Sequence, residues 1–249
     1  MLGKRIEVLG VPVDCLDWPT TLATVESQLG TAGPARAIVA VNPEKVIRAQ
    51  RDSGLLHHLR RSALLIPDGI GLVVAARLLG LGRMERVPGL ELMPRICEIA
   101  ERRSLGVYLF GARPEINDKA AAALRQRYPR LNIAGRHHGY VSEGDMERII
   151  ESINASRAAV LFVALGSPRQ EIWMGRYLER LEVRICQGVG GTFDVLAGAV
   201  KRAPGAFLRL HLEWLYRLMM DPRRLLRQSA LPKFALQVLA AWVARTAQP

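Results

Sequence analysis

The chain has 249 residues, 49% of them hydrophobic, which is long enough for one large domain or for one domain with an appendage. Lys and Arg number 35 against 23 Asp and Glu, and the formal charge of +12 indicates a polyanionic partner: nucleic acid, nucleotide phosphates or anionic lipid headgroups. The three cysteines are far apart, which argues against a disulfide framework and fits a reducing cytoplasm. Neither a signal-peptide pattern nor a bilayer-spanning apolar run is found, so we expect a cytoplasmic protein.

Apolar runs typical of buried strands alternate with helical patterns over most of the chain. The expected strands are RIEVLG (5–10), AIVAV (37–41), ALLI (63–66), GVYLF (106–110), LNIAG (131–135), AAVLFVAL (158–165) and VRICQGV (183–189). Helical segments such as 113–128 and 143–156 lie between them. This alternation predicts an α/β fold in which helices cover both faces of a mainly parallel sheet. Ligands of such sheets bind outside the carboxyl ends of the strands, so each loop that follows a strand is a candidate site.

The pattern changes after residue 204, where no further strand is predicted. Residues 206–220 place apolar side chains at helical spacing, 221–228 open with an Asp-Pro pair typical of a helix start, and a last helical segment follows Pro232. From residue 201 to the end there are nine Lys or Arg and two acidic residues. We therefore predict an α/β domain over 1–200 and a basic helical appendage over 201–249.

Two of the strand-end loops carry polar side chains that have two interpretations each. Asn42 precedes a proline, so it is either the N-cap of a helix or an amide that binds a sugar hydroxyl. Asp68 ends the stretch LIPD and precedes a glycine. Asp before Gly is common in turns, so Asp68 is either a turn residue or, because it lies at the end of a strand, a candidate general base.

Two later loops combine glycines with polar residues. In ALGSPRQE, Ser167 and Gln170 are spaced as a capping box, and Arg169 beside that helix start is a candidate phosphate or sugar ligand. In GVGGTFD, the glycines let the backbone approach a ligand, and Asp194 is either a ligand of a base or ribose or a local helix cap. Neither a dinucleotide fingerprint nor a Walker A motif is present, and no clear set of metal ligands is found.

Nine short motifs occur in order along the chain: VNPEKV, PDGIGLV, ERVPGLEL, VYLFGARPE, HHGY, ALGSPRQEIW, GVGGTFDVLAG, KRAP and LEWLYRLMMDPRRLLR. In this order they resemble the WecG/TagA/CpsF family of bacterial glycosyltransferases, over roughly residues 5–230. The resemblance implies a Rossmann-like fold and an inverting, metal-independent hexosyltransferase without a cofactor. Its donor would be a UDP-sugar and its acceptor a saccharide on a polyprenyl diphosphate. Such an enzyme acts at the inner face of the cell membrane in surface polysaccharide or exopolysaccharide synthesis.

The resemblance also implies roles for individual residues. Asp68 matches the catalytic base, which takes the proton of the acceptor hydroxyl as that hydroxyl attacks the anomeric carbon. The other matched positions bind substrates: Asn42, Arg86 and Gln170 around the donor and acceptor, Tyr140 and Asp194 at the nucleotide, and Arg217, Arg224 and Arg227 of the appendage at the diphosphate. One position departs: the family often has Thr where this chain has Ala40, which indicates a different donor or acceptor.

The basic and apolar appendage is expected to meet an anionic membrane surface, and its last segment either lies in that interface or packs on protein. Three other classes of function are considered: a nucleic-acid-binding protein, an oxidoreductase or methyltransferase, and a non-catalytic scaffold of a glycan assembly complex. The aromatic content of 6% argues against a nucleic-acid-binding protein, and the missing glycine fingerprint argues against an oxidoreductase or methyltransferase. The presence of Asp68 argues against a non-catalytic scaffold. The donor sugar, the acceptor glycan and the formation of a homo-oligomer are left open.

Overall fold

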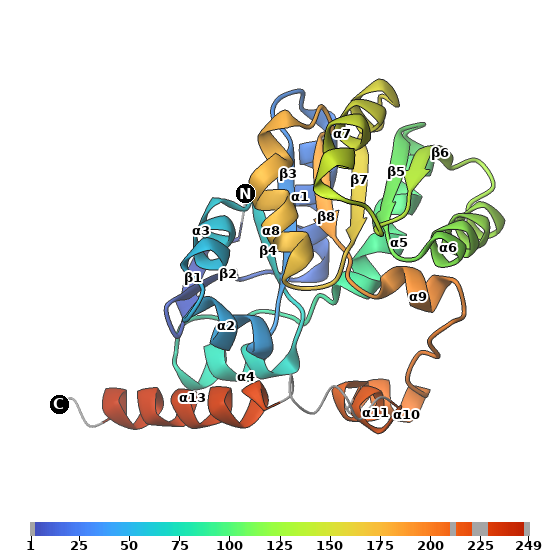
Figure 1. Cartoon of the computed structure of the whole chain (residues 1–249). Coiled ribbons are helices and arrows are strands. Elements are labelled where there is room, and N and C mark those ends of the chain that lie inside the picture. The colour runs from blue at the N-terminus through green and yellow to red at the C-terminus, as the bar shows by residue number, and fades with distance from the viewer. Residues whose placement is uncertain (1–2, 210–212, 221–228, 247–249) are drawn as a thin grey trace.

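The computed structural model describes residues 3–209, 213–220 and 229–246, and it confirms the α/β prediction (Figure 1). Six strands form the central sheet in the order β4-β3-β8-β7-β5-β6, and each neighbouring pair is parallel. Their bounds are β3 Arg36–Val41, β4 Leu64–Pro67, β5 Gly106–Gly111, β6 Asn132–His137, β7 Val160–Ala164 and β8 Ile185–Gly188. With helices on both faces, the fold is Rossmann-like.

Helices cover both faces of the sheet, which explains why its central strands are apolar without alternation. All residues of β5 and β7 are buried. One face packs against α1 Trp18–Gly30, α5 Gly89–Arg102, α6 Pro114–Arg127 and α9 Thr192–Leu196. The other face packs against α2 Pro43–Ala49, α3 Ser53–Arg61, α4 Ile70–Leu78, α7 Met146–Ala155 and α8 Arg169–Tyr177. Short 3-10 helices precede α7 (Glu143–Asp145) and follow α8 (Leu178–Arg180).

The first expected strand forms a separate hairpin instead of joining the parallel sheet. β1 Arg5–Val8 pairs antiparallel with β2 Val11–Asp14, a strand that the sequence analysis does not predict. Leu9 and Gly10 connect them with φ angles of +53° and +79°, as a two-residue hairpin turn requires. The hairpin is tied to the main sheet because the Asp14 carboxylate accepts a hydrogen bond of 2.8 Å from the Leu65 backbone N–H.

The described residues after Val200 contain helices and no strand, as predicted. These helices are α10 Gly205–Arg209, α11 Glu213–Met220 and α13 Ala230–Thr246. The helix start expected at Asp221 and Pro222 lies outside the described residues. α13 begins before Pro232 rather than after it, because proline is tolerated in the first turn of a helix. The domain boundary after residue 200 stays a prediction.

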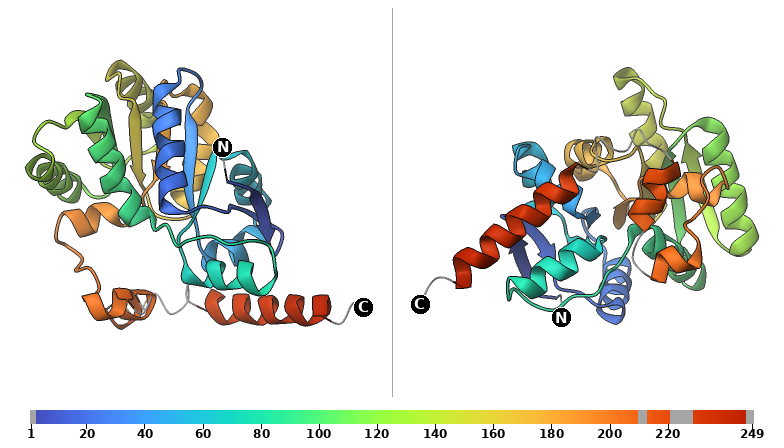
Figure 2. Two further views of the ribbon diagram at one scale, coloured as in Figure 1. Left: turned by 180° about the vertical axis from the view of Figure 1, so that it is seen from behind. Right: turned by 90° about the horizontal axis from the view of Figure 1, so that it is seen from below.

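The last helix packs on the α/β body through one of its faces. Ala230, Phe234 and Val238 are buried, and α13 contacts α2 and α4, along which it runs in both views (Figures 1 and 2). Leu236, Leu239 and Val243 lie on another face and are exposed. The helix therefore joins the body and also presents apolar side chains to solvent. Within the described residues, no helix is long and apolar enough to cross a membrane.

Candidate functional site

The loops that follow β3 and β4 are packed tightly against each other. The Asp68 backbone N–H donates to the Val41 carbonyl oxygen at 2.8 Å, which continues the pairing of the two strands beyond their ends. A Cβ atom on Gly69 would lie 2.7 Å from Cδ of Pro43 and 3.5 Å from Cβ of Asn42, so glycine is needed for this approach. The structure thus brings Asp68 and Asn42 together on neighbouring loops.

Arg86 reaches the same place from a segment that precedes α5. Its Nε donates to the Asp68 carbonyl oxygen at 3.1 Å, and the Val87 N–H donates to the Pro67 carbonyl oxygen at 2.7 Å. Both Asp68 and Arg86 are half-buried. The segment therefore holds the peptide of Asp68 in place and sets a guanidinium beside the candidate base.

Asn42 caps α2, which confirms one of its two interpretations. Its Oδ1 accepts a hydrogen bond of 2.8 Å from the Lys45 backbone N–H. Within the described residues, Asn42 Nδ2 donates to no protein group, and the side chain is half-buried. A carboxamide held by its oxygen still offers its nitrogen to a ligand, so capping and sugar binding are compatible here.

A buried ion pair lies beneath these loops. Lys45 and Glu171 are 5% and 0% exposed, and Nζ of Lys45 lies 2.7 Å from Oε1 of Glu171. The same Nζ donates to the Ala40 carbonyl oxygen at 2.6 Å. Burial alone would raise the pKa of Glu171, but the charge and hydrogen bond of Lys45, together with a hydrogen bond from Gln170, hold that pKa below its usual range. Glu171 is therefore ionised, and its contact with Lys45 links β3, α2 and α8.

Gln170 does not form the predicted capping box. α8 begins at Arg169 without a side-chain cap, and the Gln170 amide turns inward instead. Its Nε2 donates to Glu171 Oε1 at 2.9 Å, and its Oε1 accepts from the Gly190 N–H at 2.9 Å. Gly188 makes room for it, since a Cβ there would lie 2.7 Å from Gln170 Nε2. The side chain fixes the glycine loop after β8, and its role in binding substrate stays a prediction.

These contacts connect four of the candidate residues, Asp68, Asn42, Arg86 and Gln170, into one group. Tyr140, which is 70% exposed, follows β6, and Asp194 is half-buried in the first turn of α9. The side chain of Arg217, and Arg224 and Arg227 altogether, lie outside the described residues. Within the part of the chain that is described, no group of three His, Cys, Asp or Glu side chains is placed to hold a metal ion.

Ala40, the position that departs from the family pattern, lies at the end of β3 and is half-buried. A Cβ atom built on Gly89, the first residue of α5, would lie 3.4 Å from the Ala40 Cβ and 4.0 Å from Nε2 of Gln187. Gln187 is buried in β8. The side chain of Ala40 therefore lies in a narrow space between the sheet and the start of α5, where a larger residue would have little room.

Among the buried polar residues that the sequence analysis does not single out are Lys45, Glu171 and His58, which lie on α2, α8 and α3. His58 of α3 is 7% exposed and faces α8, since a Cβ on Gly175 would lie 3.3 Å from its Nδ1. Burial lowers the pKa of His58 to about 4 against the raising effect of the nearby Glu171 charge. Lys45 and Glu171 lie within the motifs VNPEKV and PRQE, but their residue types are usually exposed, so only their place in those motifs could have drawn attention.

The comparison with known proteins identifies the family of this chain. The model of the "Glycosyl transferase WecG/TagA/CpsF family" matches residues 6–248. This chain belongs to that family. Two similar proteins from Staphylococcus aureus, strains MRSA252 and MW2, are named N-acetylglucosaminyldiphosphoundecaprenol N-acetyl-beta-D-mannosaminyltransferase. Each is 34% identical over 242 residues, which cover 95% of this chain and 93% of the relative. Membership of the WecG/TagA/CpsF family confirms the resemblance that the ordered motifs indicate.

Proposed function

We propose that the chain is an inverting, metal-independent hexosyltransferase that transfers a hexose or N-acetylhexosamine-type sugar from UDP to a polyprenyl-diphosphate-linked saccharide. The observation that carries the proposal is the convergence of Asp68, Asn42 and Arg86 at the carboxyl ends of β3 and β4. Parallel sheets bind ligands at this edge. The names of the relatives support N-acetylglucosamine on undecaprenyl diphosphate as the acceptor.

The proposed reaction is a single displacement. The acceptor hydroxyl oxygen forms a bond to the anomeric carbon of the donor as the bond from that carbon to the UDP oxygen breaks on the opposite face. The hydroxyl proton moves to the Asp68 carboxylate, and the electron pair leaves with UDP. Cationic side chains, Arg86 beside Asp68 among them, offset the charge that develops on the diphosphate.

The proposal extends to the remaining substrate contacts and to the place of action. Asn42 and Gln170 act near the sugars, Tyr140 and Asp194 at the nucleotide, and the appendage arginines Arg217, Arg224 and Arg227 at the diphosphate. The enzyme works as a peripheral protein at the inner face of the cell membrane. The exposed apolar residues of α13 support this location, because apolar side chains among cations suit an anionic lipid surface.

A transfer assay tests the proposal. Radiolabelled UDP-N-acetylmannosamine, UDP-N-acetylglucosamine and UDP-glucose are each offered with undecaprenyl-diphosphate-linked N-acetylglucosamine in the presence of EDTA. We expect transfer from one donor, inverted configuration at the anomeric carbon, and a loss of at least about 100-fold in Asp68→Asn. Asp118→Asn, which removes an exposed carboxylate of α6, is the matched control and should keep full activity. Transfer that stops with EDTA, or equal rates in both variants, would contradict the mechanism.

A further inference from the structure

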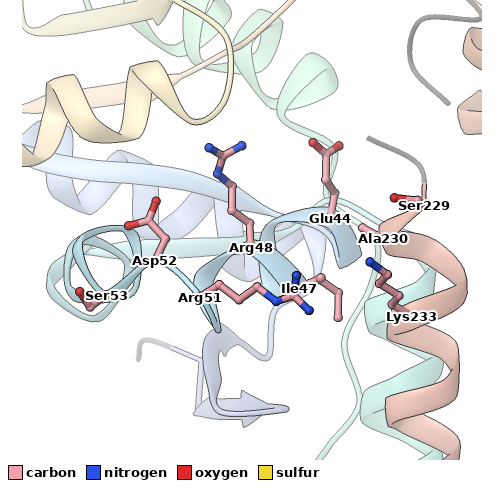
Figure 3. Close-up of a pocket in the computed structure, with 9 residues that line it drawn as sticks. All are labelled: Glu44, Ile47, Arg48, Arg51, Asp52, Ser53, Ser229, Ala230 and Lys233. Carbon is pink, nitrogen blue, oxygen red and sulfur yellow. The ribbon is translucent and has the colours of Figure 1, made fainter. Parts of the chain in front are cut away.

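A second polar site lies next to the candidate active site, in a pocket of about 660 Å³ between α2, the turn into α3 and the start of α13. Its cations are Arg48, Arg51 and Lys233, and we call it the Arg48–Arg51–Lys233 pocket. Figure 3 shows Arg51, in the turn that follows α2, and Lys233 of α13 extending toward each other across Ile47. The pocket is built by α2, the turn into α3 and α13, which is far away in the sequence, and α2 and α13 contact each other.

The charge of this pocket is not balanced within the described residues. Arg48, Arg51 and Lys233 form no ion pair there, and all three are exposed. The lining also contains the carboxylates of Glu44 and Asp52, so the cations outnumber the carboxylates by three to two. Asp52 is occupied as the N-cap of α3, where it accepts a hydrogen bond of 2.9 Å from the Leu55 N–H. The lining therefore keeps an excess of positive charge, and an anion bound between the three cations would reduce the repulsion among them.

The residue types select the kind of anion. Two guanidinium groups can each donate a pair of parallel hydrogen bonds to a phosphate, and an ammonium group adds a compact point charge. A diphosphate offers enough oxygen atoms and enough negative charge to satisfy all three groups. The pocket therefore suits a diphosphate better than a single carboxylate.

The position of the pocket fits one substrate of the proposed reaction. Asn42 caps the first turn of α2 at the candidate active site, and Arg48 lies about 9 Å farther along the same helix at 1.5 Å per residue. Beyond the pocket, α13 continues with the exposed side chains of Leu236, Leu239 and Val243. Active site, cations and apolar surface thus follow in the same order as sugar, diphosphate and lipid in the acceptor.

We propose that the Arg48–Arg51–Lys233 pocket binds the diphosphate of the polyprenyl-linked acceptor. This inference rests on the proposed function. The diphosphate anchors the acceptor there, so that its sugar hydroxyl reaches Asp68 while the lipid chain leaves along α13. The pocket sets the affinity for the acceptor and leaves the affinity for the UDP-sugar unchanged.

The test compares two triple variants of equal charge. Arg48→Gln/Arg51→Gln/Lys233→Gln empties the pocket of cations, and Lys119→Gln/Arg125→Gln/Arg130→Gln removes three exposed cations on and just after α6. Thermal unfolding followed by circular dichroism checks that both are folded. Calorimetric titration then measures binding of a short-chain polyprenyl-diphosphate N-acetylglucosamine. We expect at least about tenfold weaker binding in the pocket variant alone, with KM for the acceptor raised and KM for the donor unchanged.

Further titrations distinguish the sources of the anion. Inorganic pyrophosphate, polyprenyl monophosphate and phosphatidylglycerol vesicles are titrated against the native protein and the pocket variant. Weaker binding of the acceptor than of pyrophosphate or the vesicles would overturn the assignment, as would equal acceptor affinities in the two triple variants. If no donor supports transfer but acceptor binding still depends on the pocket, the proposed function fails and the binding site stands.

Discussion

Lys45 and Glu171 form an ion pair of 2.7 Å in the interior of the protein although they are 126 residues apart in the sequence. Lys45 lies three residues after Asn42, and Glu171 follows Gln170. The pair therefore connects the loop after β3 with the loop after β7, on the interior side of both loops. Because both groups are buried, neither can be solvated by water if its partner is lost. The pair therefore fixes the relative position of the loops after β3 and β7.

Removing one member of this pair should destabilise the protein strongly. We expect Lys45→Met to lower the free energy of unfolding by about 3 to 5 kcal/mol, because Glu171 would then be a buried charge without a counter-ion. Replacing both residues, in Lys45→Met/Glu171→Leu, should restore most of the loss. Urea denaturation measures both. Arg61→Met, which breaks the exposed pair with Glu179, is the control and should cost less than about 1 kcal/mol. A similar small loss for Lys45→Met would contradict the interpretation.

Stability should rise with pH between about 4 and 6.5 because of His58. The pKa of His58 is about 4 in the folded protein and near 6.5 in the unfolded chain, so in this range the unfolded chain binds the additional proton. Protonation of His58 therefore lowers the free energy of unfolding as the pH falls, by up to about 3 kcal/mol. Denaturation at several pH values should show this dependence flattened in His58→Gln and unchanged in His57→Gln, whose side chain is exposed. An unaltered slope in His58→Gln would rule out this residue as the cause.

Two substitutions separate the capping role of Asn42 from its proposed role in binding sugar. Asn42→Asp keeps an oxygen that accepts from the Lys45 N–H and removes only the amide donor, so we expect native stability with transfer reduced about tenfold. Asn42→Ala removes both and should also lose about 1 kcal/mol of stability. Thermal unfolding and acceptor kinetics measure the two effects. Full activity in Asn42→Asp would show that the side chain serves only as a cap.

Arg86 should need its guanidinium rather than its charge alone. Lysine lacks the Nε that donates to the Asp68 carbonyl oxygen, so Arg86→Lys should displace the loop of the candidate base. We expect kcat to fall about 10- to 100-fold, with little change in KM for the donor. The control is Arg83→Lys, which changes an exposed arginine of the same segment. Steady-state kinetics that give equal kcat values in the two variants would contradict this role.

The parts of the fold and site that follow from local pattern could be predicted from the sequence. Asp68 and Asn42 each follow an apolar run, and parallel strands bring such positions to one edge, so their proximity is a consequence of fold class. The inward turn of the Gln170 amide could not be predicted, because it depends on Gly188 and Gly190 from a distant strand. The Gln170 side chain therefore makes this long-range contact instead of the capping contact that the local pattern predicts.

The same limit applies to the buried charges and to the N-terminal hairpin. In the sequence, Lys45 and Glu171 resemble exposed helix residues, because their residue types are rarely buried. They can be buried here because each neutralises the charge of the other, and only the fold brings them together. β2 was missed since it contains Pro12 and follows its partner strand after only two turn residues. Pair interactions at long range decide these features, and a single sequence does not display them.

The strand order also bears on how the chain is made. β8 lies between β3 and β7, and Ile38 pairs with Gln187, so the sheet joins the beginning of the chain to its late part. A nascent chain that ends before residue 185 has β3 and β7 with unpaired edges, which readily associate with other strands. Contacts of such long range also slow folding. Residues 1–184 therefore cannot complete the sheet during synthesis, and truncation before β8 should yield aggregated rather than folded protein.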